Sequence, residues 1–284
     1  MSIIIMVDSC ANITKSMGKR HGLNVLPYNV MFNNGDCYKD VIDIKNQDTL
    51  LNLIDSHGTF PKIDQIPMSE IESCFRKIID NGDDILYIGV SSKLSGAYHE
   101  VLEVSKKFDN STIQVIDSLN AGSGQTLLAM YARDYINNGH GLKQTAKYLN
   151  DIKHNIRSFY TINDASYLYK QKRCEDIIDD YMKFYRRVPI AQIDKGKIIL
   201  TFNGYKDDVA NQIIKDTILD YSRYIDTSHM VISYSGDKSK ALKLKQKSNK
   251  IFSDINVSLV ENSSSVYMNT GNNSLGVAFL VNKK

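Results

Sequence analysis

The sequence predicts an α/β protein in two parts, an N-terminal parallel sheet flanked by helices and a C-terminal α+β domain. Strand-like and helix-like segments alternate through the first half, which is typical of a parallel sheet with helices on both faces. The second half opens with two strand-like runs around Asp194-Lys195-Gly196, a hairpin pattern. The 284 residues also exceed the roughly 100–150 residues of a usual domain. We therefore assign residues 1–160 to the first domain and 161–284 to the second.

The first half begins with strands and a long excursion. Ile3–Val7 is a short apolar run, and Leu23–Val30 is a second strand-like run that Pro27 interrupts. Residues 32–57 are polar and irregular, so we expect little regular structure there. Long irregular segments in compact domains often form lids or binding loops.

The next segments have clearer boundaries. Ser69 and Glu72 have the spacing of a capping box, which predicts a helix over 69–80. Ile85–Val90 is nearly all apolar, as a strand buried on both faces should be. Further segments predict a strand at 112–117, helices at about 125–138 and 142–156, and a last strand of this half at 159–162.

The second half combines a hairpin with helix–strand alternation. The hairpin strands are expected at Val188–Ile193 and Lys197–Phe202. The remaining expected elements are helices at about 207–225 and 237–250 and strands at 229–234, 256–260 and 275–281.

Composition narrows the function. Lys and Arg number 35 against 32 Asp and Glu, a net charge of +3 that disfavours a dedicated nucleic-acid binder. No apolar stretch reaches the roughly 18–20 residues of a membrane span. Four scattered cysteines without a C-x-x-C pair, and no signal-peptide pattern, favour a reducing cytoplasm. The histidine spacing does not support zinc, so we expect no metal.

Three loops that follow predicted strands carry hydroxyls or carboxylates. They are Asp8-Ser9, the run from Ser91 to Gly96, and Asp117-Ser118. In an open parallel sheet, ligands bind outside the carboxyl ends of the strands, and a helix N-terminus such as Ser95-Gly96 can hold an anion. The alternative is that these residues only cap helices, which such positions favour anyway.

Nucleophilic catalysis has weak support. The chain lacks a G-x-S-x-G elbow, and the G-x-G at Gly122–Gly124 has no following G-K-[ST]. Ser95 has His99 one helical turn away, a pair that leaves an enzyme with a Ser95 nucleophile, supported by His99 or Asp117, as one alternative.

Several motifs occur in order along nearly the whole chain. They are V-D-S with Ile13 at the start, Leu26-Pro27, Tyr38-Lys39-Asp40, V-S-S-K-L-S-G-A-Y at 90–98, V-I-D-S at 115–118, and Asn269-Thr270-Gly271 followed by L-G-V-A-F at 275–279. With these motifs the chain resembles the DegV family, whose characterised bacterial members bind long-chain fatty acids as the FakB-type carrier subunit of a fatty acid kinase.

The resemblance implies a two-domain DegV-like (EDD) fold with an acyl chain buried between the domains. Burial of each methylene is worth roughly 0.8 kcal/mol, and the carboxylate must be met by donors. The resemblance implies that Ser95 is one such donor. The candidate ligand-binding residues are Ser92, Ser95, Gly96, Ile63, Asp64, Asn269 and Thr270.

The chain departs from the family at three places. The head-group motif T-S-Q-P-S appears here as Ile63-Asp64-Gln65-Ile66-Pro67, the closing His is Asn269 followed by Asn272-Asn273 instead of P-G, and G-G-R is Q-K-R ending at Arg173. Asp64 about 4 Å from a carboxylate would cost on the order of 4 kcal/mol at an effective dielectric near 20. Asp64 therefore points away, shares a proton with the ligand, or faces a head group that is not a free carboxylate. A shift in the alignment would instead bring Thr59 near the site.

The resemblance favours a carrier over an enzyme. We expect a protein that binds a long-chain fatty acid or related lipid and presents its head group to a kinase subunit, without a cofactor of its own. Arg173, with Lys170 and Lys172, is the candidate docking surface for that partner. The alternatives are a lipid-binding protein of the same fold with a different ligand, the enzyme above, and a homologue that no longer binds ligand and serves only as an interaction module.

Overall fold

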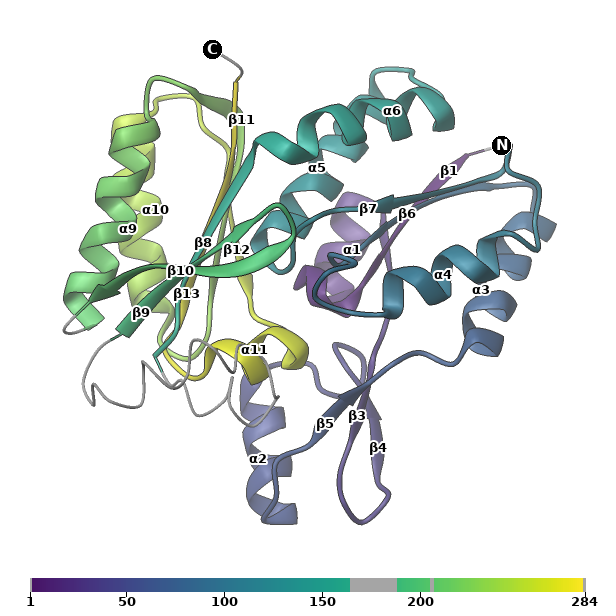
Figure 1. Cartoon of the computed structure of the whole chain (residues 1–284), viewed down its shortest axis with the longest axis horizontal. Helices are drawn as coiled ribbons and strands as arrows, with labels where there is room; N and C mark the ends of the chain where they lie inside the picture. Colours follow the sequence, from purple (N-terminus) through teal and green to yellow (C-terminus); the bar gives the residue numbers. More distant parts are fainter. Residues whose placement is uncertain (1, 164–187, 205–206, 283–284) are drawn as a thin grey trace.

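The computed structural model describes residues 2–163, 188–204 and 207–282. These residues form the α/β fold that the sequence predicts, with two sheets and a smaller third sheet (Figure 1). The first sheet has the order β2-β1-β6-β7, and every pair in it is parallel. Its strands are β1 (Ile3–Asp8), β2 (Leu23–Leu26), β6 (Asp84–Gly89) and β7 (Ile113–Asp117).

Helices cover both faces of the parallel sheet. One face packs α3 (Met68–Asp80) and α4 (Ala97–Ser105) through Phe75, Tyr87 and Val101. The other face packs α5 (Ser123–Asn137) and α6 (Leu142–Ile152). The short helices η1 (Ser9–Ala11), α1 (Lys15–His21) and η2 (Lys153–Asn155) complete this half.

The second sheet has the order β10-β9-β8-β13-β11-β12 and is antiparallel except for the pair β11–β12. Its strands are β8 (Ile156–Thr161), β9 (Val188–Asp194), β10 (Lys197–Gly204), β11 (Ile225–Tyr234), β12 (Val257–Glu261) and β13 (Leu275–Val281). Helices α9 (Asp207–Tyr221) and α10 (Lys238–Ile251) pack on its outer face. The predicted hairpin is confirmed, with Lys195 and Gly196 at its tip.

Helix α5 lies between the two sheets. Every residue from Ser123 to Ala132 is buried. Its apolar side chains share one cluster with Ile5 and Val7 of the parallel sheet and with Val231 and Ala278 of the second sheet. Because neighbours from both sheets cover this stretch, α5 joins the two halves.

Three expectations were wrong. Residues 32–57 are not irregular, because they contain β4 (Cys37–Lys39) and α2 (Gln47–His57), which Asn46 caps by accepting from the Thr49 N–H at 3.0 Å. Helix α3 begins at Met68 after Pro67 and has no side-chain cap, so Ser69 forms no capping box. The strand near 159–162 is β8, which pairs with β13 and β9 and therefore belongs to the second sheet.

The third sheet, β4-β3-β5, comes from the excursion that follows β2. It consists of β3 (Asn29–Met31), β4 and β5 (Lys62–Asp64), all antiparallel. With α2 it forms an apolar cluster against Tyr267 and Met268 of α11 (Ser264–Thr270). The excursion of the first half thus packs on a helix of the second (Figure 1).

A buried carboxylate connects the excursion to that helix. Asp40 is fully buried and accepts hydrogen bonds from the Ser264 N–H at 3.0 Å, the Ser265 N–H at 3.3 Å and the Ser265 hydroxyl at 2.9 Å. These N–H groups belong to the first turn of α11, where no intrahelical acceptor exists. Asp40 therefore fixes the start of α11.

We predict that Asp40→Ala lowers the free energy of unfolding by about 3 kcal/mol, because it leaves buried donors without a charged acceptor. Asp40→Asn keeps the size and one acceptor oxygen, so it should lose about half as much. Urea unfolding measures both, with the exposed Asp55→Ala on α2 as the control. An Asp40→Ala protein as stable as the control would contradict this role.

Candidate functional site

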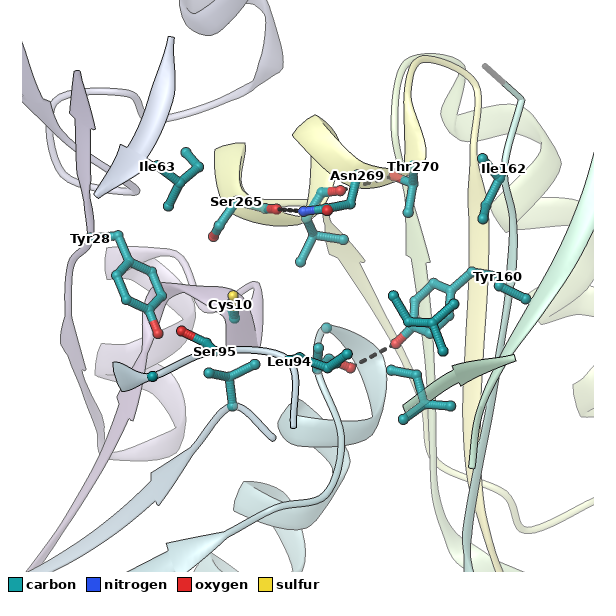
Figure 2. Close-up of a pocket in the computed structure, with 18 of the residues that line it drawn as sticks. Cys10, Tyr28, Ile63, Leu94, Ser95, Tyr160, Ile162, Ser265, Asn269 and Thr270 are labelled. Carbon is teal, nitrogen blue, oxygen red and sulfur yellow. Dashed lines mark hydrogen bonds between the residues drawn. The ribbon is translucent and has the colours of Figure 1, made fainter. Parts of the chain in front are cut away.

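A cavity of about 280 Å³ lies where the carboxyl ends of the parallel strands face the second sheet and α11. It is lined by Cys10, Tyr28, Ile63, Asp64, Gln65, Val90, Leu94, Ser95, Gly96, Ala121, Gly122, Tyr160, Ile162, Ala191, Ile193, Ile198, Ser265, Val266, Asn269 and Thr270. Residues from both halves of the chain therefore build it, and most of them are apolar (Figure 2). Its position agrees with the rule that ligands bind at the carboxyl ends of parallel strands.

The loop between β6 and α4 forms one wall. The N–H groups of Leu94 and Ser95 donate to the Ser91 carbonyl at 2.9 and 3.1 Å, so the loop is a tight turn. The Ser95 hydroxyl points into the cavity and also accepts the Ala97 N–H at 3.3 Å (Figure 2). Ser95 thus accepts the first N–H of α4, whose N-cap is Gly96, and also lines the cavity, so the two interpretations of this position do not exclude each other.

Tyr28 places a second hydroxyl beside Ser95. The side chain is 3% exposed, and its hydroxyl faces the Ser95 hydroxyl (Figure 2). Burial, followed by the nearby charge of Asp8, raises the pKa of Tyr28 well above its usual value, while the Ser95 hydroxyl acts in the opposite direction. The phenol therefore keeps its proton, and its O–H is a buried donor directed at the space near Ser95 (Figure 2).

Asp8 lies beneath this polar end of the cavity. It is fully buried at the end of β1, and it accepts hydrogen bonds from the Val90 N–H at 2.7 Å, the Cys10 N–H at 3.0 Å and the Tyr87 hydroxyl at 3.1 Å. Burial raises the pKa of Asp8, although these hydrogen bonds oppose the shift. Asp8 holds the β1 and β6 loops together and is not among the lining residues.

Helix α11 forms the opposite wall with the polar side chains of Ser265, Asn269 and Thr270. The Asn269 amide donates to the Ser265 carbonyl at 2.7 Å, but its buried Oδ1 accepts no hydrogen bond among the described residues. The Thr270 hydroxyl donates to the Val266 carbonyl at 3.2 Å and accepts from Ser274 at 3.0 Å. Asn269 is therefore the member of this wall with an unused acceptor.

Strands β8, β9 and β10 supply the apolar part of the lining. Ile162, Ala191, Ile193 and Ile198 line it beside Tyr160, whose hydroxyl donates to the Ala121 carbonyl at 2.7 Å. Burial raises the pKa of Tyr160 to about 12. Because the Tyr160 hydroxyl already donates to Ala121, Tyr160 lines the cavity with its aromatic ring.

The tip of the β9–β10 hairpin is held against the loop that carries Ser95. The Ser91 hydroxyl donates to the Gly196 carbonyl at 2.8 Å, and the Lys93 ammonium donates to the Lys195 carbonyl at 2.8 Å. Because the same hairpin carries Ala191, Ile193 and Ile198, these two bonds hold the second half of the chain over the cavity.

The structure brings six of the seven predicted site residues to the cavity: Ile63, Asp64, Ser95, Gly96, Asn269 and Thr270. It does not bring Ser92 there, because the Ser92 N–H is turned to the Asp117 carboxylate at 3.2 Å. Thr59 is also outside the lining, so the shifted alignment has no support. Arg173, Lys170 and Lys172 lie outside the described residues.

Several lining residues were missed. Tyr28 directly follows the Leu26-Pro27 motif, so its position next to a motif was the available indication. Cys10 follows the V-D-S motif in the same way. Ala191, Ile193 and Ile198 have no local indication, since only the tertiary fold places the hairpin over the cavity.

Other chemistries find little support in the part of the chain that the structure describes. No hydrogen bond joins Ser95 to His99, and Asp117 instead accepts the N–H groups of Ser92 and Leu119. Within the described ranges, no three His, Cys, Asp or Glu side chains cluster as a metal site. No helix there has the length and apolar character to cross a bilayer.

We predict that Gly196→Ala loosens the hairpin tip. Gly196 has φ +84°, and an added Cβ would lie 2.6 Å from the Ser91 hydroxyl oxygen, so that hydroxyl must move. Amide hydrogen exchange in β9 and β10 should speed up by about ten-fold as the hydrogen bond from Ser91 to Gly196 weakens. Gly58→Ala is the matched control, since Gly58 has φ +61° with open space around it. Equal exchange rates in the two variants would contradict the role of this hydrogen bond in holding the hairpin.

Comparison with known proteins agrees with this architecture. A family model described as "Uncharacterised protein, DegV family" matches residues 2–282. A DegV domain-containing protein of Streptococcus pyogenes serotype M3 is 25% identical over 254 residues, which are 87% of this chain and 86% of the relative.

Two solved structures share the fold. A DegV family protein from Thermus thermophilus, described for its fatty acid binding, superposes with a TM-score of 0.89 at 17% identity, covering 99% of this chain and 100% of the other. The fatty acid kinase (Fak) B3 protein of Streptococcus pneumoniae, loaded with linoleic acid, gives 0.84 at 14% identity, covering 99% and 100%. The motifs, the fold and the family model over residues 2–282 together show that this chain belongs to the DegV family.

Proposed function

We propose that this protein binds a long-chain fatty acid or related lipid in the cavity and presents the head group to a partner kinase. The observation that carries the proposal is the cavity itself, which is mainly apolar along β8–β10 and polar at Tyr28 and Ser95. Relatives of the same fold that are described with bound fatty acids support the choice of ligand.

The geometry suits an acyl chain with one polar end. Each methylene that leaves water contributes roughly 0.8 kcal/mol, so a long chain supplies the affinity. The head group then needs partners, since a buried polar group without hydrogen bonds is costly. Ser95, the backbone at Gly96 and the Tyr28 hydroxyl are the groups we assign to it.

We assign the protein the role of a carrier and not of an enzyme. The Ser95 hydroxyl accepts the Ala97 N–H and makes no hydrogen bond with His99. This supports the assignment, because an activated serine needs a base within hydrogen-bond reach. The phosphoryl transfer would belong to the partner, which we propose docks through Arg173, Lys170 and Lys172 in the cytoplasm.

A second candidate is a lipid with a different head group. Asp64 favours it, because this carboxylate lines the cavity where the family has a hydroxyl. A homologue without any ligand is less well supported, since the cavity is open and not filled by side chains.

We predict that Ala191→Phe blocks the apolar part of the cavity and weakens binding of a fluorescent C16 fatty acid by at least about ten-fold. Ala191 is buried and lines the cavity, whereas Ala146 is buried between α6 and the parallel sheet, away from it. Ala146→Phe is therefore the control for overpacking alone. Thermal unfolding of both variants checks that they fold. Unchanged binding by a folded Ala191→Phe protein would reject this cavity as the site.

A further inference from the structure

The polar end of the cavity has an unusual charge balance for a site that receives an anion. Among the described lining residues, Asp64 is the one formally charged side chain, and no Lys, Arg or His belongs to that lining. Lys93, on the same loop as Ser95, donates its ammonium to the Lys195 carbonyl and is not a lining residue. The described lining therefore offers a carboxylate ligand no side chain of opposite charge, and only the partial positive charge of the α4 N-terminus at Gly96.

Further carboxylates surround the same end. The fully buried Asp8 lies beneath it, and its charge is one cause of the raised pKa of Tyr28. Glu100 on α4 lies against the side-chain amide of Gln65, which can donate to the carboxylate once its nitrogen is turned toward it. Burial, with the charge of Asp64 adding, raises the pKa of Glu100. Asp64 itself accepts the Gln65 N–H at 2.9 Å and is exposed at the rim. An ionised head group would thus lie near several carboxyl groups, of which the exposed Asp64 belongs to the lining.

Apart from the Asp64 carboxylate, the polar atoms of the lining that are available to a ligand belong to neutral side chains. Tyr28 offers a buried hydroxyl that faces the Ser95 hydroxyl, and Asn269 offers a buried oxygen that accepts no hydrogen bond among the described residues. An ionised carboxylate can only accept, whereas a hydroxyl or an un-ionised carboxyl both donates and accepts. Neutral partners satisfy such a group fully, but they compensate the charge of an anion less well than a Lys or Arg side chain would.

We propose that this site takes its lipid with an un-ionised, hydrogen-bonding head group, a hydroxyl or a protonated carboxyl, and that Asp64 discriminates against the ionised carboxylate. This inference rests on the proposed lipid-binding function and specifies its ligand class. Tyr28 and Ser95 bind the head group, and Asp64 sets the selectivity from the rim.

The test compares oleic acid with oleyl alcohol, which have the same hydrocarbon chain length and the same double bond. Dissociation constants are measured on the delipidated full-length protein at about pH 8, where the acid is ionised in water. The wild type should bind the alcohol at least about five-fold more tightly than the acid. Asp64→Asn should strengthen acid binding by roughly three- to ten-fold, a modest effect because the side chain is exposed, and should leave the alcohol unchanged. The exposed Asp254→Asn, outside the lining, is the matched control.

A third variant locates the head group. Tyr28→Phe removes the hydroxyl that we assign to the head group, so it should weaken binding of both ligands by about ten-fold. The inference is overturned by an acid that binds as tightly as the alcohol, by an Asp64→Asn protein that does not favour the acid, or by a silent Tyr28→Phe. In those cases lipid binding itself still stands. If neither ligand binds, the proposed function fails, and the inference fails with it.

Discussion

The architecture depends on a buried polar contact between loops of the first half and the start of α11. Asp40 accepts three hydrogen bonds from Ser264 and Ser265, and Asn12 accepts the Ser263 N–H at 2.9 Å while donating to Asn262 at 3.0 Å. Buried groups of this kind are costly unless every partner is in place, so they permit one arrangement of the two segments. That arrangement sets where α11, with Asn269 and Thr270, stands relative to the Ser95 loop.

The cavity follows from this constraint together with two others. Helix α5 is buried against both sheets and fixes their separation. The Ser91–Gly196 and Lys93–Lys195 bonds hold the hairpin over the opening between them. Side chains from the parallel sheet, the second sheet and α11 therefore surround a space that none of them fills. The affinity for an acyl chain would come from this shape, and the selectivity from the few polar groups at one end.

Much of the fold could be predicted from the sequence because its periodicity is local. The apolar β6 strand, the β9–β10 hairpin and β13 all lie where their patterns indicate. Strand β8 was given to the first half, because no local pattern tells which sheet a strand joins. The segment 32–57 is polar on its exposed side, yet α2 packs Leu50 against Tyr267, over two hundred residues away. The contact that stabilises α2 therefore joins residues far apart in the sequence, and a local pattern cannot reveal it.

The candidate site divides in the same way. Family motifs indicated Ser95, Gly96, Asn269 and Thr270, but proximity in the motif also suggested Ser92, whose N–H donates to Asp117.

The most direct test of the account is a crystal structure of the purified protein, with mass spectrometry of the lipid extracted from it. The account predicts continuous density for an acyl chain along β8–β10, with its polar end at Tyr28 and Ser95. A cavity that holds only water, with no lipid in the extract, would contradict it.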